Sequence, residues 1–317
     1  MELQDLHELK PDVAISIRKV GITGVKMPIG YISFNNKPVV VVPVFNVFIN
    51  LPANQKGIHA SRSYEVIAEV LSEHAGRRYK LEEICAAIAS ELLKRHGYAS
   101  RSEVQARGEA VYEKKTPRTE ILTYESCHIL AKAIAYREKN DSVSVKRFVG
   151  VRVTGITACP CAQEILENCS REQIATVKPL SKVEVDGILS QIPVATHMQR
   201  GYGSIIMELP KNMEVDAMRL VRVIEDSMSA PTFELLKRPD EADLVMEAAN
   251  KPRFAEDCIR YMMKNFVEAF PSLPDGTSVV FSMKSKESIH KHDLVAERSI
   301  TMGEMKREIS ELGSMAT

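Results

Sequence analysis

The stretch Val-Ser-Val-Lys-Arg-Phe-Val-Gly-Val-Arg-Val-Thr, residues 143–154, decides the fold class of this chain. Its valines fall on odd-numbered positions and its polar side chains mostly on even ones, which predicts a β-strand with one buried face. The strand leads into a turn, residues 157–164, in which Pro160 separates Cys159 from Cys161. Two cysteines this close cannot form a relaxed disulfide. The turn therefore holds either small buried thiols or a rigid thiolate offered to a metal or substrate.

Strands and helices alternate in the same order on both sides of this stretch. Two strands, two helical segments and two strands fill residues 1–140, and the same order fills 141–317, with a largely helical insertion at 164–191. This order predicts an α+β protein made of two tandem ββααββ units, with antiparallel sheets and helices on one face. We expect strands at 13–25, 38–51, 103–113, 120–137, 143–154, 192–209, 279–283 and 294–302. Exposed sheet edges need pairing, so we also expect an oligomer.

Composition excludes several classes of function. Among 317 residues, Lys+Arg and Asp+Glu both number 42, so no global basic field attracts nucleic acid or an anionic membrane. The most apolar run, 38–51, is too short to span a bilayer. The charged N-terminus is not a signal peptide, and the six cysteines lack the spacing of a disulfide framework. We expect a cytoplasmic protein with free thiols and neither a nucleic-acid nor a membrane partner.

Several histidines and carboxylates outside the turn have more than one interpretation. His197 precedes Arg200-Gly201, a plausible anion contact, yet a lone histidine near a strand is more often structural. Asp240 and Glu241 lie at an expected helix start, where capping is the default role. The spacing of His290 and His292 suits a metal pair or a polar binding surface, because i and i+2 share one side of a strand.

Two further segments carry weaker signals. Residues 56–62, Lys-Gly-Ile-His-Ala-Ser-Arg, combine cations, a histidine and a hydroxyl at a helix start, which suits phosphate but lacks P-loop spacing. Glu256 lies beside the apolar stripe of an expected helix, where a solvated charge is the default interpretation.

Together these motifs resemble the GTP cyclohydrolase IB family, and most closely its archaeal branch. The resemblance covers nearly the whole chain and keeps the family's order. The matching segments are 56–62 (KGIHASR), 159–161 (CPC), 197–200 (HMQR), 236–241 (LKRPDE), 254–257 (FAED) and 287–292 (ESIHKH).

The resemblance implies a fold, an assembly and a metal. The family has the tunnelling fold (T-fold), in which ββααββ units close into barrels, here in a homotetramer with sites at subunit interfaces. Cys159, His197 and Glu241 would be the ligands of one metal per active site, leaving a position for water. The resemblance implies Fe(II), with Zn(II) or Mn(II) as substitutes.

The resemblance also implies substrate and catalytic groups. The substrate would be GTP, whose imidazole ring is hydrolysed at C8 with release of formate. The expected product is 7,8-dihydroneopterin 2′,3′-cyclic phosphate, for methanopterin synthesis. The implied catalytic residues are Glu256, His290, His292, His59 and Cys161; Glu287 would anchor guanine, and Lys56, Arg62 and Arg200 are the candidates for the triphosphate.

Two other functions remain open from the sequence. One is a T-fold nitrile reductase that acts on a deazaguanine with a cysteine nucleophile, NADPH and no metal. The other is a purine- or pterin-binding protein with a structural metal, which would bind GTP without releasing formate. Metal content and formate release separate the three functions.

Overall fold

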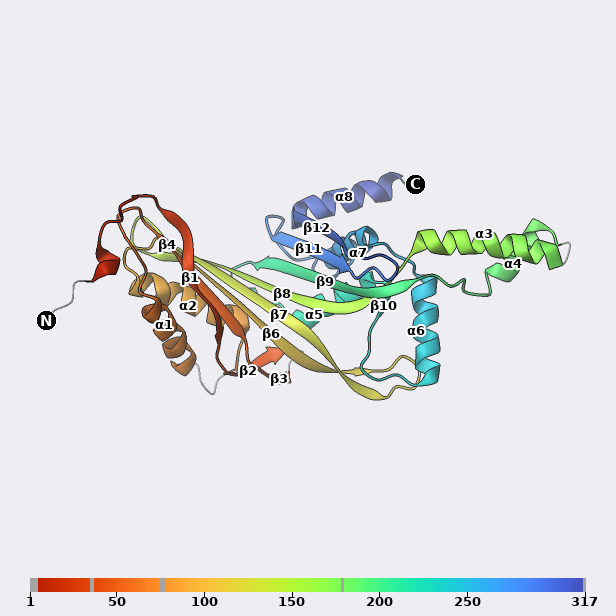
Figure 1. Cartoon of the computed structure of the whole chain (residues 1–317), viewed down its shortest axis with the longest axis horizontal. Coiled ribbons are helices and arrows are strands. Elements are labelled where there is room, and N and C mark those ends of the chain that lie inside the picture. Colours follow the sequence, from red (N-terminus) through yellow and green to blue (C-terminus); the bar gives the residue numbers. More distant parts are fainter. Residues whose placement is uncertain (1–4, 35–36, 74–77, 178–179, 212, 316–317) are drawn as a thin grey trace. The chain divides into compact units, whose positions relative to one another are not determined.

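The computed structural model describes residues 5–34, 37–73, 78–177, 180–211 and 213–315 (Figure 1). A 3₁₀ turn, η1 (Leu6–Glu8), precedes the first strand. The helices are α1 (Ala60–Glu73), α2 (Leu81–Arg95), α3 (Pro160–Val177), α4 (Lys182–Leu189), α5 (Ala217–Ser227), α6 (Arg238–Asn250), α7 (Ala255–Ala269) and α8 (Met302–Met315). The strands are β1 (Ile17–Lys26), β2 (Ile29–Phe34), β3 (Lys37–Val41), β4 (Val44–Leu51), β5 (Arg78–Tyr79), β6 (Arg101–Lys115), β7 (Leu122–Arg137), β8 (Val143–Ala158), β9 (Met198–Leu209), β10 (Ala230–Pro231), β11 (Ser278–Ser285) and β12 (Leu294–Thr301).

The chain divides into two compact units that are discontinuous in sequence. Unit 1 comprises residues 1–110, 128–151 and 206–218, and unit 2 comprises 111–127, 152–205 and 219–317. The long strands β6, β7, β8 and β9 contribute residues to both units. These units follow packing rather than the expected halves 1–140 and 141–317, so that boundary stays a prediction.

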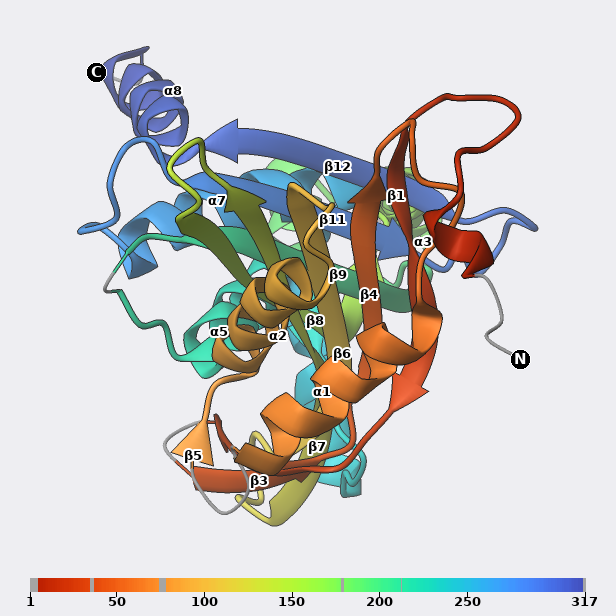
Figure 2. The ribbon, with the colours of Figure 1, turned by 90° about the vertical axis from the view of Figure 1, so that its left-hand side faces the viewer.

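Unit 1 is an antiparallel sheet covered by two helices. Its strands run in the order β1-β4-β6-β7-β8-β9, with Ile17 opposite Leu51 and Val44 opposite Arg107. Alternating side chains of β4 are buried, as a strand with one core face requires. Figure 2 shows α1 and α2 side by side in front of these strands, where their apolar faces complete the core.

Unit 2 contains the other end of the strand order. Its strands run in the order β6-β7-β8-β9-β11-β12, and β10 pairs with β8. β11 and β12 pair antiparallel over their whole length. α7 packs against β11, where the rings of Phe266 and Phe281 meet edge to face at 5.5 Å.

The expected helical insertion consists of α3 and α4, which run together away from the strands of unit 2 (Figure 1). It leaves and rejoins the sheet at one point, because the N–H of Cys159 donates to the carbonyl of His197 at 3.2 Å. Two residues 38 positions apart in sequence are therefore backbone neighbours.

Three local expectations were wrong. The strand expected at 192–209 begins only at Met198. The strand expected at 38–51 is two strands, because the chain breaks at Val42-Pro43, and β2 with β3 forms an unexpected hairpin. The last strand ends at Thr301, and a further helix, α8, follows it.

Within the described residues, no helix is both long and apolar enough to cross a membrane.

Candidate active site

A pocket of about 230 Å³ lies in unit 2 at the end of β8. It collects side chains from the ends of β8 and β11, the start of β9, and the segment that enters α7. The residues that line it are Thr157, Ala158, Cys159, His197, Gln199, Arg253, Phe254, Ala255, Ser285, Glu287, His290, His292 and Leu294. Five of the residues expected in the site are among them: Cys159, His197, Glu287, His290 and His292.

Cys159 enters the pocket from the start of a helix. It precedes Pro160, whose fixed φ suits the first position of α3, and the N–H of Ala162 donates to its sulfur at 3.5 Å. A helix N-terminus favours negative charge, and the thiolate is the form of cysteine that binds a metal. Cys161, two residues further on, is exposed and does not line the pocket.

His197 lies beside Cys159 and is oriented by its neighbours. The hydroxyl of Thr196 donates to the carbonyl of Cys159 at 2.7 Å, which holds the two backbones together. The Nδ1 atom of His197 lies 2.9 Å from Oε1 of Gln199 and 3.2 Å from Oγ of Ser288. Both polar neighbours face Nδ1, so Nε2 is the ring atom left for a metal.

Glu287 follows β11 and is half-buried. Its two carboxylate oxygens lie 3.3 and 3.4 Å from Nε2 of Gln199. A carboxylate has four acceptor positions, so this contact leaves oxygen lone pairs for a ligand.

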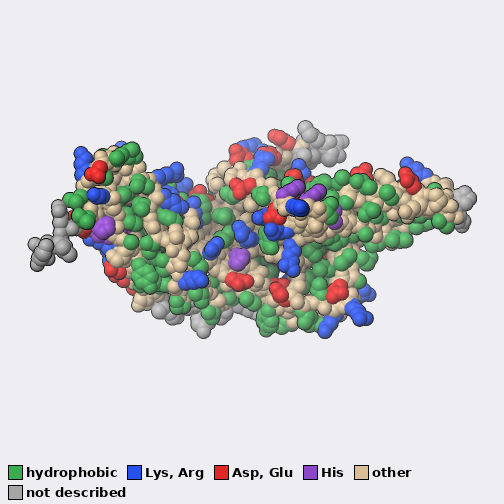
Figure 3. Space-filling model, in the orientation of Figure 1, with side chains coloured by type: hydrophobic (Ala, Val, Ile, Leu, Met, Phe, Trp, Pro, Cys, Tyr) green, Lys and Arg blue, Asp and Glu red, His purple; other side chains and the backbone are tan. Residues whose placement is uncertain are grey.

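His290 and His292 stack on each other after β11. Their ring centroids are 5.1 Å apart and the ring planes differ by 9°, so the two imidazoles lie parallel. They lie in a bent segment between β11 and β12 and not in the strand on which the i, i+2 expectation rested. Both side chains are exposed. Figure 3 shows histidine side chains gathered on this part of the surface.

The two neighbouring carboxylates at the start of α6 have different roles. Asp240 is fully buried and caps α6 by accepting from the N–H of Lys237 at 3.0 Å. It also accepts from the N–H groups of Arg118 and Thr119 and from the Thr119 hydroxyl. Burial raises the pKa of Asp240, but these hydrogen bonds outweigh it and hold the pKa well below its usual value. Glu241 is exposed and does not line the pocket.

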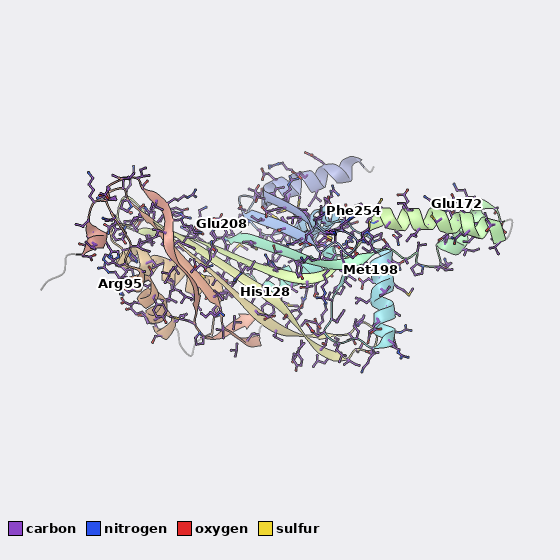
Figure 4. All side chains as sticks on the ribbon, viewed as in Figure 1. Arg95, His128, Glu172, Met198, Glu208 and Phe254 are labelled. Atoms are coloured by element: carbon purple, nitrogen blue, oxygen red, sulfur yellow. The ribbon has the colours of Figure 1, made fainter. Side chains whose placement is uncertain are left out.

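The start of α7 forms another wall of the pocket. Phe254 and Ala255 line it, and exposed Glu256 follows them directly. Arg253 stacks over the ring of Tyr261 at 3.6 Å. Figure 4 labels Phe254 at this wall and Glu172 on α3, along the insertion.

Three further expected residues, Lys56, His59 and Arg62, belong to unit 1. Lys56 is exposed, and His59 and Arg62 are partly buried. The Nε2 atom of His59 lies 2.6 Å from Asp5, and this hydrogen bond, together with those from His7, lowers the pKa of Asp5 to about 2. Arg200 is exposed in unit 2, just after Gln199.

Sequence reasoning missed this histidine–carboxylate cluster. Asp5, His7 and His59 each offer a donor atom, and these atoms lie within 4.8 Å of one another. Among the described residues this is the one such group of three donors, so Cys159 and His197 are not joined by a third donor at that distance. The predicted set Cys159, His197 and Glu241 stays a prediction.

The sequence matches known proteins over almost its full length. The family model described as "Type I GTP cyclohydrolase folE2" matches residues 3–296. The chain is 41% identical to the GTP cyclohydrolase MptA of Methanococcus aeolicus, over 96% of this chain and 99% of that one. It is 40% identical to the protein of the same name from Methanothermobacter thermautotrophicus, over 97% and 96%.

Solved structures share the fold at much lower identity. A uricase from Bacillus fastidious superposes with a TM-score of 0.52 at 10% identity, covering 92% of this chain and 96% of that one. A urate oxidase from Bacillus sp. TB-90 gives 0.52 at 8% identity, covering 90% and 100%. This likeness concerns the fold alone. It supports the expected α+β architecture with an antiparallel sheet of the tunnelling kind.

Proposed function

The chain belongs to the type I GTP cyclohydrolase folE2 family, and we propose that it hydrolyses the guanine ring of GTP in the pocket of unit 2. One observation carries the proposal: this pocket gathers Cys159, His197, Glu287, His290 and His292, which the sequence scatters over 134 positions (292 minus 158).

The donor chemistry of the pocket fits a divalent metal. Cys159 supplies sulfur at a helix start and His197 has Nε2 directed away from its polar neighbours. We assign the third ligand to Glu241, an exposed carboxylate outside the pocket lining that follows buried Asp240. Mixed S, N and O ligands suit Fe(II), Zn(II) or Mn(II), and we propose Fe(II) as the native ion. A bound metal would supply an activated water at neutral pH for attack on C8.

The side chains of the pocket position the purine. Glu287 accepts hydrogen bonds from the guanine N1–H and 2-amino groups, which fixes the ring orientation. Exposed Glu256, at the start of α7, transfers protons during ring opening, together with His290 and His292. Cys161, which follows Pro160 and is exposed beside the pocket, is assigned a supporting catalytic role.

The triphosphate requires cations, which the pocket itself provides sparingly. We assign this role to Arg200 from unit 2 and to Lys56 and Arg62 from unit 1, with His59 as an acid–base or phosphate contact. We further propose that the two ββααββ halves are tandem T-fold units. They would assemble into a cytoplasmic homotetramer with sites at subunit interfaces.

The reaction class is tested by labelling the carbon that should leave. Anaerobic incubation with GTP carrying ¹³C at C8 should release labelled formate, one per pterin formed. The mass of the pterin then distinguishes 7,8-dihydroneopterin 2′,3′-cyclic phosphate from the triphosphate. GTP that binds but retains its labelled carbon would contradict the proposal and favour a purine-binding protein.

A further inference from the structure

Gln199 is the side chain that joins the two halves of the pocket. It is the second residue of β9 and is partly buried. Its Oε1 lies 2.9 Å from Nδ1 of His197, and its Nε2 lies 3.3 and 3.4 Å from the two oxygens of Glu287. One amide therefore bridges an expected metal ligand and the expected guanine anchor.

The hydrogen-bonding capacity of these groups fixes the orientation of the amide. The ionised carboxylate of Glu287 only accepts hydrogen bonds, so the amino end of Gln199 must face it. The carbonyl end then faces His197, and because a carbonyl cannot donate, the 2.9 Å contact is a hydrogen bond when Nδ1 of His197 carries the proton. The hydroxyl of Ser288 fits this arrangement, because it can donate to Oε1 of Gln199 at 3.4 Å and accept from Nδ1 at 3.2 Å. The lone pair of the neutral ring is thereby placed on Nε2, the atom that would bind the metal.

A buried pair of hydroxyls holds the amide in this orientation. Nε2 of Gln199 also lies 3.3 Å from Oγ of Ser285, a side chain that is only 1% exposed. Oγ of Ser285 lies in turn 3.2 Å from Oγ1 of buried Thr157. The two hydrogens of the Gln199 amino group thus have one partner each, Glu287 and Ser285. A flipped amide would place its oxygen against Glu287, where two acceptors would repel.

We propose that Gln199 is a positioning residue that sets the tautomer of His197 for metal binding and holds Glu287 for the guanine ring. The inference rests on the proposed function, but it assigns a role to a side chain outside the expected ligand and catalytic sets. Partners that orient a metal-bound histidine typically contribute 10–100-fold to metal affinity. Gln199 would add to this an equal influence on recognition of the purine.

Two substitutions of Gln199 test the roles of the two ends of its amide separately. Gln199→Met keeps the length of the side chain but removes both hydrogen bonds. It should weaken metal binding about 10–100-fold and raise KM for GTP about tenfold or more. Gln199→Glu keeps an acceptor for Nδ1 of His197 but places a like charge beside Glu287. Its metal affinity should stay within about threefold of native, while its KM for GTP rises as in the methionine variant.

Metal affinity is measured without substrate, by competition of Zn(II) with a chromophoric chelator, and KM from formate release. The matched control is Gln105→Met in β6, where a glutamine amide also donates to a carboxylate, Glu103, at 2.6 Å but lies in unit 1. This control should keep native metal affinity and KM. Native values in both Gln199 variants would overturn the inference, as would equal loss of metal affinity in both. If the native protein binds metal and releases no formate, the proposed function fails, while the metal-affinity prediction for the two variants is still tested.

Discussion

At the scale of the residue, the proposed recognition of guanine depends on Glu287. Glu287→Gln keeps the shape of the side chain but presents a donor to the donor groups of the base. We expect KM for GTP to rise about 10–100-fold, the effect of losing hydrogen bonds to a charged group. Kinetics of formate release measure this change. Glu297→Gln, an exposed carboxylate of β12, is the matched control. An unchanged KM for Glu287→Gln would contradict the proposed role of Glu287 in binding guanine.

His96 gives the stability of unit 1 a dependence on pH. It is fully buried and contacts Ser63 and Tyr98. Burial, reinforced by the charge of Arg62, lowers the pKa of His96 from 6.5 to about 4. His96 therefore becomes protonated near pH 6.5 in the unfolded chain but only near pH 4 in the folded chain. Stability should fall as the pH drops through this window.

Melting temperatures between pH 7 and pH 4 test this prediction. The His96→Gln variant should be less stable at pH 7 but should lose about 3–5 °C less than the native protein across the window. His128→Gln, which changes an exposed histidine of β7, should follow the native pH dependence. If the melting temperature of His96→Gln falls with pH as steeply as that of the native protein, the acid sensitivity comes from other groups.

Single residues were predictable where they belong to a short motif. The pocket unites Cys159, His197 and Glu287 because β8, β9 and β11 are neighbours in the sheet, and the motifs alone pointed to these residues. Gln199 was not singled out, because its role depends on a carboxylate 88 positions away. The bond between Asp5 and His59 spans 54 positions and has no local signal at all.

At the scale of the element, Asp240 fixes the start of α6 and hence the place of Glu241. Its carboxylate caps the helix and accepts from Arg118 and Thr119 in the turn between β6 and β7. Asp240→Asn turns one oxygen into a donor that faces other donors. We expect Tm to fall by about 3–6 °C and metal affinity to fall with it.

Thermal unfolding and chelator competition measure the two effects of Asp240→Asn. The control is Asp243→Asn, three residues further along α6, which forms a surface ion pair with Arg118 at 3.2 Å. That control should change Tm by less than about 1 °C, as a surface pair contributes little. A native Tm in Asp240→Asn would show that the buried carboxylate does not anchor α6.

Elements were predictable where side-chain periodicity is long and clean. The long strands β6, β7 and β8 and the helices α2 and α7 lie where alternation and apolar stripes predict them. The break at Val42-Pro43 was not predicted, because it lies inside a continuous run of apolar residues. The start of α8 had a readable signal, since Thr301 and Glu304 form a capping box, but the alternation of β12 masked it.

At the scale of the whole molecule, the proposed tetramer makes a prediction about shared sites. If Lys56, His59 and Arg62 of one subunit complete the pocket of another, inactive variants should complement each other. Mixing His59→Ala with His197→Ala under conditions that exchange subunits should restore about a quarter of native activity, the statistical share of intact sites. Formate release from the mixture, against each variant alone, measures it. No recovery in tetramers shown to be mixed would place each site within one chain.

The most direct measurement of the central claim is formate release from GTP by anaerobic Fe(II)-loaded protein, with a chelator-treated sample alongside. The account predicts formate in the first sample only, restored to the second by added Fe(II). It also predicts no formate and no bound metal in Cys159→Ala and His197→Ala, which should remain folded. Formate release that is equal in all samples would contradict metal-dependent hydrolysis in this pocket. A folded native protein that releases none with any divalent metal would contradict the cyclohydrolase function itself.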